Sequence, residues 1–341
     1  MNVQKKIERF PKIDLHCHLD GSVRPETILE IALKEDIHVP TTKIEAFKQH
    51  TQVAEDCSSL KEYLSKFALT SDVMQKSEYI YRITDELLED LSNENVKYIE
   101  IRFAPFLHME KGMTFEEAVE SVLKAMEEGK EKYGILSKLI LICMRRHSPE
   151  VSVQIVEKGK AYLGKGVVAI DLAGNEHDFP PELHKKAFQL AKEYGFHRTV
   201  HAGETGIPKN IITAVEELKA ERIGHGIHAY LNEEILEFVK EKKIPLEMCI
   251  SSNVQTKAVE GFEDHPIKKY LDEGIAVTIN TDNITVSNTT LAKEYEILMN
   301  KQGFTLEDIK QTIINGINAS FASNEEKEEL TGIFKEEFFK L

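Results

Sequence analysis

Two histidines near the N-terminus have the spacing of a metal-binding pair. His16 and His18 lie two residues apart in the segment KIDLHCH, and alternate residues of a β-strand point to the same face. Both imidazoles are therefore expected to face one side, with Cys17 facing the other. Imidazole nitrogens are common zinc ligands, so this pair can hold one ion.

Residues of the same chemical kinds follow two other apolar segments. His201 opens the sequence HAGE, and Asp282 lies in NTDN. Together with His16 and His18 they would supply three nitrogen ligands and one oxygen ligand. Such a set suits zinc and leaves a further position open for water, which is typical of a catalytic zinc site.

Two more side chains could act beside this ion. Glu204 lies three residues after His201 at a glycine-flanked turn, where its carboxylate can face a water on the metal without binding the metal. His225 stands between Gly224 and Gly226, which would leave room for its ring close to the site. The sequence therefore places an acid–base group next to the predicted metal.

The strands that must position these residues can be identified as short apolar, β-branched runs. We expect them at residues 12–18, 96–104, 138–144, 167–173, 198–202, 222–227, 245–250 and 276–281. Runs such as LILIC are apolar on both faces, as parallel strands covered by helices are. Eight such strands predict a (β/α)₈ barrel, in which residues at the carboxyl ends of the strands face the active site.

The segments between the strands have the length and periodicity of helices. Single crossover helices are expected at 114–132, 150–162, 181–194, 207–218 and 232–242. Further helices are expected after the last strand, at 291–300, 305–321 and 324–341. The whole chain, residues 1–341, is thus predicted to be one barrel domain with extra C-terminal helices.

The connection from Gly21 to Asn95 is too long for one crossover helix. Its apolar residues at helical spacing are Leu60, Tyr63, Leu64 and Phe67. We expect a helical insertion after the first strand. It could be a lid that contacts substrate or an amphipathic helix that packs on the barrel wall.

Composition excludes several classes of protein. No apolar run approaches the roughly 20 residues that cross a bilayer, and the N-terminus lacks the pattern of a secretory signal, so we expect a cytoplasmic protein without a membrane partner. A net charge of -15 disfavours a nucleic-acid partner. The four cysteines are far apart, which argues against a disulfide framework. Gly164 and Gly166 precede a strand and lack a third glycine, so no dinucleotide cofactor is implied.

Seven motifs follow one another along the chain: IDLHCHLDGS (13–22), EIRFAP (100–105), DLAGNE (171–176), HAGE (201–204), RIGHG (222–226), SSN (251–253) and NTDN (280–283). In this order they resemble the adenosine deaminase family of the amidohydrolase superfamily. The resemblance extends from about Pro11 to about Ala322. It implies a zinc-dependent hydrolase that converts adenosine, and 2′-deoxyadenosine, to the 6-oxo nucleoside and ammonia in purine salvage.

The resemblance also implies roles for the candidate residues. The ligands of one zinc ion per chain would be His16, His18, His201 and Asp282. Zinc would activate a water that attacks C6 of the purine, and Glu204 would protonate N1 and then pass a proton to the departing amine. His225 and Asp282 would hold the attacking water.

Substrate contacts are implied in the same way. Asp20 and His18 would lie near the ribose 5′-hydroxyl, and the backbone of Gly174 would contact N3 of the purine. Asn283, near N7, stands where the commonest family pattern has a second aspartate. Because N7 accepts a hydrogen bond and an amide donates at any pH, this departure fits purine binding.

Two other hypotheses are weighed against this one. The first is a related deaminase of free adenine, a methylated adenine nucleotide or a modified nucleoside, and a carboxylate such as Asp20 near the 5′ position favours a nucleoside because it would repel a phosphate. The second is a non-catalytic barrel that binds nucleosides or partner proteins. It predicts a broken metal set, whereas this chain has the complete set.

Overall fold

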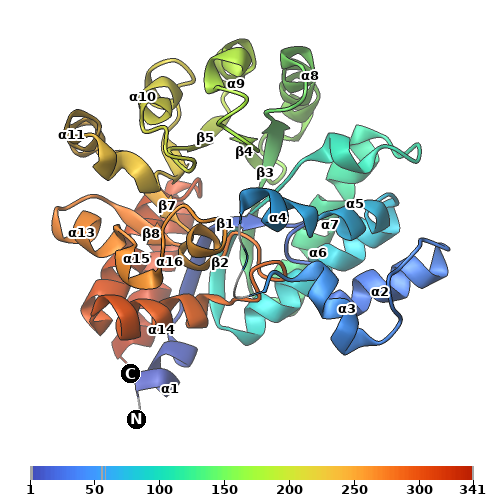
Figure 1. Cartoon of the computed structure of the whole chain (residues 1–341), viewed down its shortest axis with the longest axis horizontal. Coiled ribbons are helices and arrows are strands. Elements are labelled where there is room, and N and C mark those ends of the chain that lie inside the picture. The colour runs from blue at the N-terminus through green and yellow to red at the C-terminus, as the bar shows by residue number, and fades with distance from the viewer. Residues whose placement is uncertain (1–2, 55–56, 58, 340–341) are drawn as a thin grey trace.

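Eight parallel strands form a barrel surrounded by helices in the computed structural model, which describes residues 3–54, 57 and 59–339 (Figure 1). The strands are β1 (Lys12–His18), β2 (Val96–Phe103), β3 (Leu136–Met144), β4 (Val167–Ala173), β5 (His197–Ala202), β6 (Arg222–His225), β7 (Leu246–Met248) and β8 (Val277–Ile279). Each strand pairs in parallel with the next one in the sequence. The predicted (β/α)₈ barrel is confirmed.

The barrel closes where the end of β1 meets the residues that follow β8. Cys17 and Asp282 form a parallel bridge at this point. The backbone N–H of Asp282 donates to the carbonyl of His16 at 2.8 Å, and the N–H of His18 donates to the carbonyl of Asp282 at 2.7 Å. We call this junction the seam. It joins the backbones of three of the predicted metal ligands.

The crossover helices lie on the outside of the barrel, as predicted. They are α7 (Phe115–Tyr133), α8 (Pro149–Gly159), α9 (Lys185–Tyr194), α10 (Lys209–Glu216) and α11 (Glu233–Glu241). Two short 3₁₀ helices, η2 (Lys160–Tyr162) and η3 (Pro181–His184), occupy ends of the segments predicted as helix. Local signals fix the ends of α7, because Thr114 and Glu117 form a capping box and Gly134 ends the helix at φ 70°.

The structure differs from the sequence prediction after β6 and β7. Strand β6 ends at His225 because Gly226 adopts φ 66°, in the left-handed region, which turns the chain out of the sheet. Ile250, expected to end a strand, instead begins the short helix α12 (Ile250–Gln255). The helices α13 (Ile267–Asp272) and α1 (Val3–Arg9) were also not expected.

The connection between β1 and β2 is helical, as expected. It contains α2 (Pro25–Lys34), α3 (Ile44–Thr51), α4 (Leu60–Ser65), α5 (Ala68–Val73) and α6 (Ser77–Asn93). Helix α6 packs on α7 and β2 and is therefore the crossover helix, while α2 to α5 form the insertion (Figure 1). The insertion lies beside the carboxyl end of the barrel, where α4 reaches the cavity described below.

The predicted C-terminal helices are α14 (Leu291–Gln302), α15 (Leu306–Ala319) and α16 (Asn324–Phe339). Helix α15 packs against β8 and β1, and Gly316 permits the close approach because an added Cβ would lie 2.8 Å from Cγ2 of Ile13. All four cysteines are buried, and none of them forms a disulfide. Within the described residues, none of the helices combines the length and apolar character that a bilayer crossing requires.

Candidate metal-dependent active site

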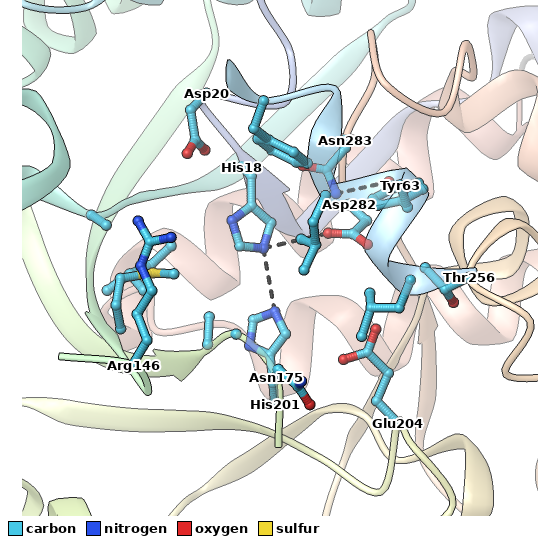
Figure 2. Close-up of a pocket in the computed structure, with 18 of the residues that line it drawn as sticks. His18, Asp20, Tyr63, Arg146, Asn175, His201, Glu204, Thr256, Asp282 and Asn283 are labelled. Atoms are coloured by element: carbon cyan, nitrogen blue, oxygen red, sulfur yellow. Dashed lines mark hydrogen bonds and ion pairs between the residues drawn. The ribbon is translucent and has the colours of Figure 1, made fainter. Parts of the chain in front are cut away.

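A cavity of about 460 Å³ opens at the carboxyl ends of the barrel strands (Figure 2). Every candidate residue except His16 lines it: His18, Asp20, Gly174, His201, Glu204, His225, Asp282 and Asn283. His16 is fully buried directly behind them. The structure thus brings all the predicted site residues together at one end of the barrel.

The predicted metal ligands converge on one point. The Nε2 atoms of His18 and His201 lie 3.3 Å apart, and Oδ1 of Asp282 lies 3.4 Å from Nε2 of His18. The same oxygen lies 3.4 Å from Nε2 of His16, a buried nitrogen without a hydrogen-bond partner. Three nitrogens and one oxygen that face a common point fit a divalent metal ion, and the orphaned nitrogen of His16 gains a partner when one binds.

Buried carboxylates behind two of the rings set them up as ligands. Nδ1 of His16 lies 2.8 Å from Glu247, and Nδ1 of His201 lies 3.1 Å from Asp171. Because a carboxylate accepts, Nδ1 of each ring carries the proton and Nε2 keeps its lone pair for the metal. Arg102 bridges the two carboxylates, at 3.0 Å from Asp171 and 2.9 Å from Glu247. We call Arg102, Asp171 and Glu247 the buried charge network.

Burial also favours the neutral form of two of the histidines, as metal binding requires. It lowers the pKa of both His16 and His18, so that these rings are neutral and can bind through a lone pair. Burial alone would raise the pKa of Asp282, but hydrogen bonding and charge from the neighbouring histidines, His16 first among them, lower that pKa well below its usual range. This lowering needs protonated rings, and a bound cation would take over the same effect when the rings are neutral ligands.

Glu204 is held at the cavity wall by a further buried carboxylate. Glu176 accepts hydrogen bonds from the backbone N–H groups of Gly203 at 3.0 Å, Glu204 at 2.6 Å and Thr205 at 2.7 Å. This fixes the turn after β5 and directs the Glu204 side chain into the cavity. Its Oε1 lies 3.8 Å from Nε2 of His225, so the two predicted proton-handling groups face each other.

Two of the site residues have strained backbones. His225 and Asp282 both adopt φ 60°, in the left-handed region that residues with a Cβ rarely occupy. Such a conformation costs about 1 to 2 kcal/mol per residue. Both residues line the cavity, so this strain is located at the candidate site.

The other end of the cavity carries groups suited to a polar ligand (Figure 2). Oδ1 of Asp20 is buried without a hydrogen-bond partner, and burial raises the pKa of this carboxyl to about 6. Elsewhere on the cavity wall, Gly174 adopts φ 107°, a backbone conformation that disfavours other residues. Asp20 and Glu204 lie at opposite ends of the metal-ligand group.

The insertion contributes one wall of the cavity. We call this the insertion wall, and its residues are Leu60, Tyr63, Leu64 and Phe67. The Tyr63 hydroxyl accepts a hydrogen bond from Nδ2 of Asn283 at 3.0 Å and lies 2.7 Å from Oγ of Ser287. Oδ1 of Asn283 fits against Gly21, where an added Cβ would lie only 1.8 Å away. Of the two interpretations of the insertion, contact with the cavity is the one the structure supports.

Several residues of the site carried no predicted role. Arg102, Asp171 and Glu176 lie inside motifs of the resemblance but received no function there. Glu247 lies in no such motif, and its only signal was a carboxylate within an apolar strand segment. Tyr63 was expected to be part of an apolar helix face, whereas its hydroxyl contacts Asn283.

Comparisons with known proteins give one consistent result. The family model described as "Adenosine deaminase" matches residues 11–336. An adenosine deaminase from Clostridium kluyveri is 55% identical over 336 residues, which cover 98% of this chain and 96% of the relative.

Two solved structures are also similar. The adenine deaminase from Arthrobacter aurescens has a TM-score of 0.91 and 27% identity, covering 97% of this chain and 99% of the other. An amidohydrolase from Burkholderia ambifaria with bound Zn has a TM-score of 0.89 and 26% identity, covering 100% of this chain and 94% of the other.

Proposed function

The chain belongs to the adenosine deaminase family, and we propose that it hydrolyses adenosine and 2′-deoxyadenosine to the 6-oxo nucleosides and ammonia. The observation that carries this proposal is the convergence of three histidines and Asp282 beside Glu204 in one buried cavity. As expected from the sequence, we further propose that the reaction serves purine salvage in the cytoplasm.

We propose zinc as the metal, one ion per chain. Its ligands would be His16, His18, His201 and Asp282. The donor set suits zinc, and the similar amidohydrolase from Burkholderia ambifaria binds Zn. When bound, zinc supplies an activated water at neutral pH.

Glu204 would handle the protons of the reaction. Addition of water at C6 breaks the aromaticity of the ring unless N1 accepts a proton, and the Glu204 carboxyl can give that proton. Glu204 would then transfer a proton from the added water to the amine, so that ammonia leaves and a 6-oxo purine remains. Its 3.8 Å distance from His225 supports this role, because both groups then face the same reacting atoms.

The opposite end of the cavity would bind the sugar and the far edge of the purine. Asp20 would accept a hydrogen bond from the ribose 5′-hydroxyl, and His18 would lie near the same hydroxyl. The Gly174 backbone would contact N3 of the purine, and Asn283 would donate to N7. The alternative substrate is free adenine, because the similar protein from Arthrobacter aurescens is an adenine deaminase. The buried, unpartnered Oδ1 of Asp20 favours a nucleoside, because adenine has no hydroxyl to satisfy it.

A substrate screen tests the proposal. Metal analysis of the purified chain would be combined with ultraviolet and ammonia-release assays on adenosine, 2′-deoxyadenosine, adenine and AMP. We expect about one zinc per chain, comparable kcat/KM for the two nucleosides, and much lower values for adenine and AMP. A preference for adenine would contradict the assignment of Asp20, and a metal-free chain with full activity would contradict the mechanism.

A further inference from the structure

A buried chain of hydrogen bonds leads away from His225 on the side opposite the cavity. Nδ2 of Asn253 lies 3.0 Å from Nδ1 of His225. Oδ1 of Asn253 lies 3.1 Å from Nε2 of His265, and the backbone N–H of Ile267 donates to Nδ1 of His265 at 3.2 Å. The side chains are sealed from solvent, with exposed fractions of 1% for His225, 0% for Asn253 and 3% for His265.

The backbone group at the far end sets the direction of the whole chain. An N–H can only donate, so Nδ1 of His265 is the acceptor and its ring proton must be on Nε2. This ring is neutral, because burial lowers the pKa of His265 to about 3. Nε2 therefore donates to Oδ1 of Asn253, and the Asn253 amide nitrogen is left facing His225. Since that nitrogen can only donate, Nδ1 of His225 must accept.

We propose that Asn253 and His265 are positioning residues that hold His225 with its proton on Nε2, as a hydrogen-bond donor toward the reaction. The inference rests on the proposed function, because that function identifies the reacting atoms. Nε2 of His225 faces Glu204 and the metal ligands, so its N–H would point at the oxygen that adds to C6. In this form His225 stabilises charge on that oxygen and cannot take a proton from it through Nε2. The proton must then go to Glu204.

The opposite arrangement conflicts with its surroundings at two places. If His225 carried its proton on Nδ1, the Asn253 amide would have to turn over, and its NH₂ group would meet the N–H of His265, donor against donor. In addition, once Glu204 has given its proton to N1, its carboxylate would face the Nε2 lone pair of His225, acceptor against acceptor. Buried polar groups without partners are strongly disfavoured. One backbone N–H thus determines the tautomer of a ring three hydrogen bonds away.

Histidine ¹⁵N NMR on the zinc-loaded full chain tests this directly. The His225 signals are identified by their loss in His225→Gln, and we expect the wild-type ring to be protonated on Nε2. In His265→Leu nothing fixes the Asn253 amide, so we expect a mixture of His225 tautomers and a fall in kcat of about 10- to 100-fold, with a smaller change in KM. His265→Gln keeps an N–H toward Asn253 and should retain the wild-type tautomer and most of the activity.

The outcomes separate positioning from packing. Metal content and thermal unfolding of both variants show whether the fold is intact. A wild-type ring protonated on Nδ1 would overturn the inference, and so would an unchanged His225 tautomer in a folded His265→Leu chain. If His265→Leu fails to fold, the spectra of the wild type and of His265→Gln still show which nitrogen of His225 carries the proton. Because the spectrum needs no substrate, a different substrate would contradict the proposed function and leave the tautomer result standing.

Discussion

The two sides of the cavity are held in place by different interactions. On the metal side, the proposed ligands lie at or shortly after the ends of strands, and behind them lies the buried charge network, whose residues Arg102, Asp171 and Glu247 are fully buried. On the other side, the insertion wall is held by neutral contacts. The Tyr63 hydroxyl forms hydrogen bonds with Asn283 and Ser287. The Tyr63 ring packs in a small hydrophobic cluster that is separate from the main core.

This difference suggests that chemistry and substrate recognition can be altered separately. The metal side depends on opposite charges without access to water, where removal of one partner leaves an uncompensated charge. The insertion wall includes Leu64, which is 44% exposed, and three of its four residues lie in the short helix α4. Segments with few buried contacts open more easily than core strands. We expect changes on the metal side to abolish the reaction and changes on the insertion wall to shift substrate preference.

The largest effect is expected from Asp282→Ala. This change removes the only oxygen ligand of the proposed set, so zinc and activity should be lost together. Metal analysis and an ammonia-release assay measure both quantities. The exposed Asp72 of α5 offers a matched control, since Asp72→Ala should keep both. If Asp282→Ala retained one zinc per chain, the proposed ligand set would be wrong, and with it the expected difference between the metal side and the insertion wall.

Glu204→Gln should separate the chemistry from the metal. The amide has nearly the same shape but cannot relay a proton, and general acid–base catalysis contributes about 10²- to 10⁴-fold. We expect kcat to fall by that factor while zinc content and substrate binding are preserved. A loss below about tenfold would show that another group protonates N1.

Glu247→Gln tests whether the charge network supports the metal. His16 would lose its carboxylate partner and Arg102 one of its two, so zinc affinity should fall by about 10- to 100-fold. The free energy of unfolding should fall by roughly 3 to 5 kcal/mol, because Arg102 becomes partly uncompensated in the core. Chelator competition and denaturant unfolding give the two values. Glu241→Gln, on the surface of α11, should change neither.

Asp20→Ala belongs to the substrate end of the cavity. Loss of one buried charged hydrogen bond costs about 1.5 to 3 kcal/mol, so kcat/KM for adenosine should fall about ten- to a hundredfold. Activity on free adenine should change far less, since adenine lacks the proposed hydroxyl partner. Equal losses on both substrates would refute the assignment.

The smallest effect is expected from Tyr63→Phe. Without the hydroxyl, the Asn283 amide loses the partner that orients it, at a cost of about 0.5 to 1.5 kcal/mol. The preference for adenosine over 7-deazaadenosine should therefore fall by about two- to tenfold, with zinc content unchanged. Tyr81→Phe on α6 is the matched control. If kcat/KM for both compounds fell equally, the insertion wall would act on the reaction itself and the two sides would not be separable.

The sequence predicts the metal side much better than the insertion wall. Strands β1 and β4 have the predicted bounds, because β1 alternates polar with apolar residues, His16 and His18 among them, and β4 is a nearly continuous apolar run. The insertion could be predicted only as helical, since helical spacing of apolar residues does not show which distant residues that face contacts. Its contact between Tyr63 and Asn283 joins residues 220 positions apart.

Supporting residues were missed for a related reason. Glu247 contacts His16 across 231 positions, and no local pattern reports that distance. His265 was assigned no role at the site, and its link to the site passes through Asn253 on α12, a helix absent from the prediction. Roles that depend on a second residue across the barrel require the three-dimensional structure.

The seam gives the chain a late point of assembly during its synthesis. Oγ1 of Thr281 donates to the Asp14 carboxylate at 2.6 Å across 267 positions, and the neighbouring Asp282 would supply the last of the proposed ligands, beside histidines that are synthesised earlier. A nascent chain that stops short of this point holds its histidines without their carboxylate. Pairing over such a separation is slow to form, and a metal that binds only the closed barrel stabilises it once formed. Retention of the ion would then report that translation and folding have both reached the end of the barrel.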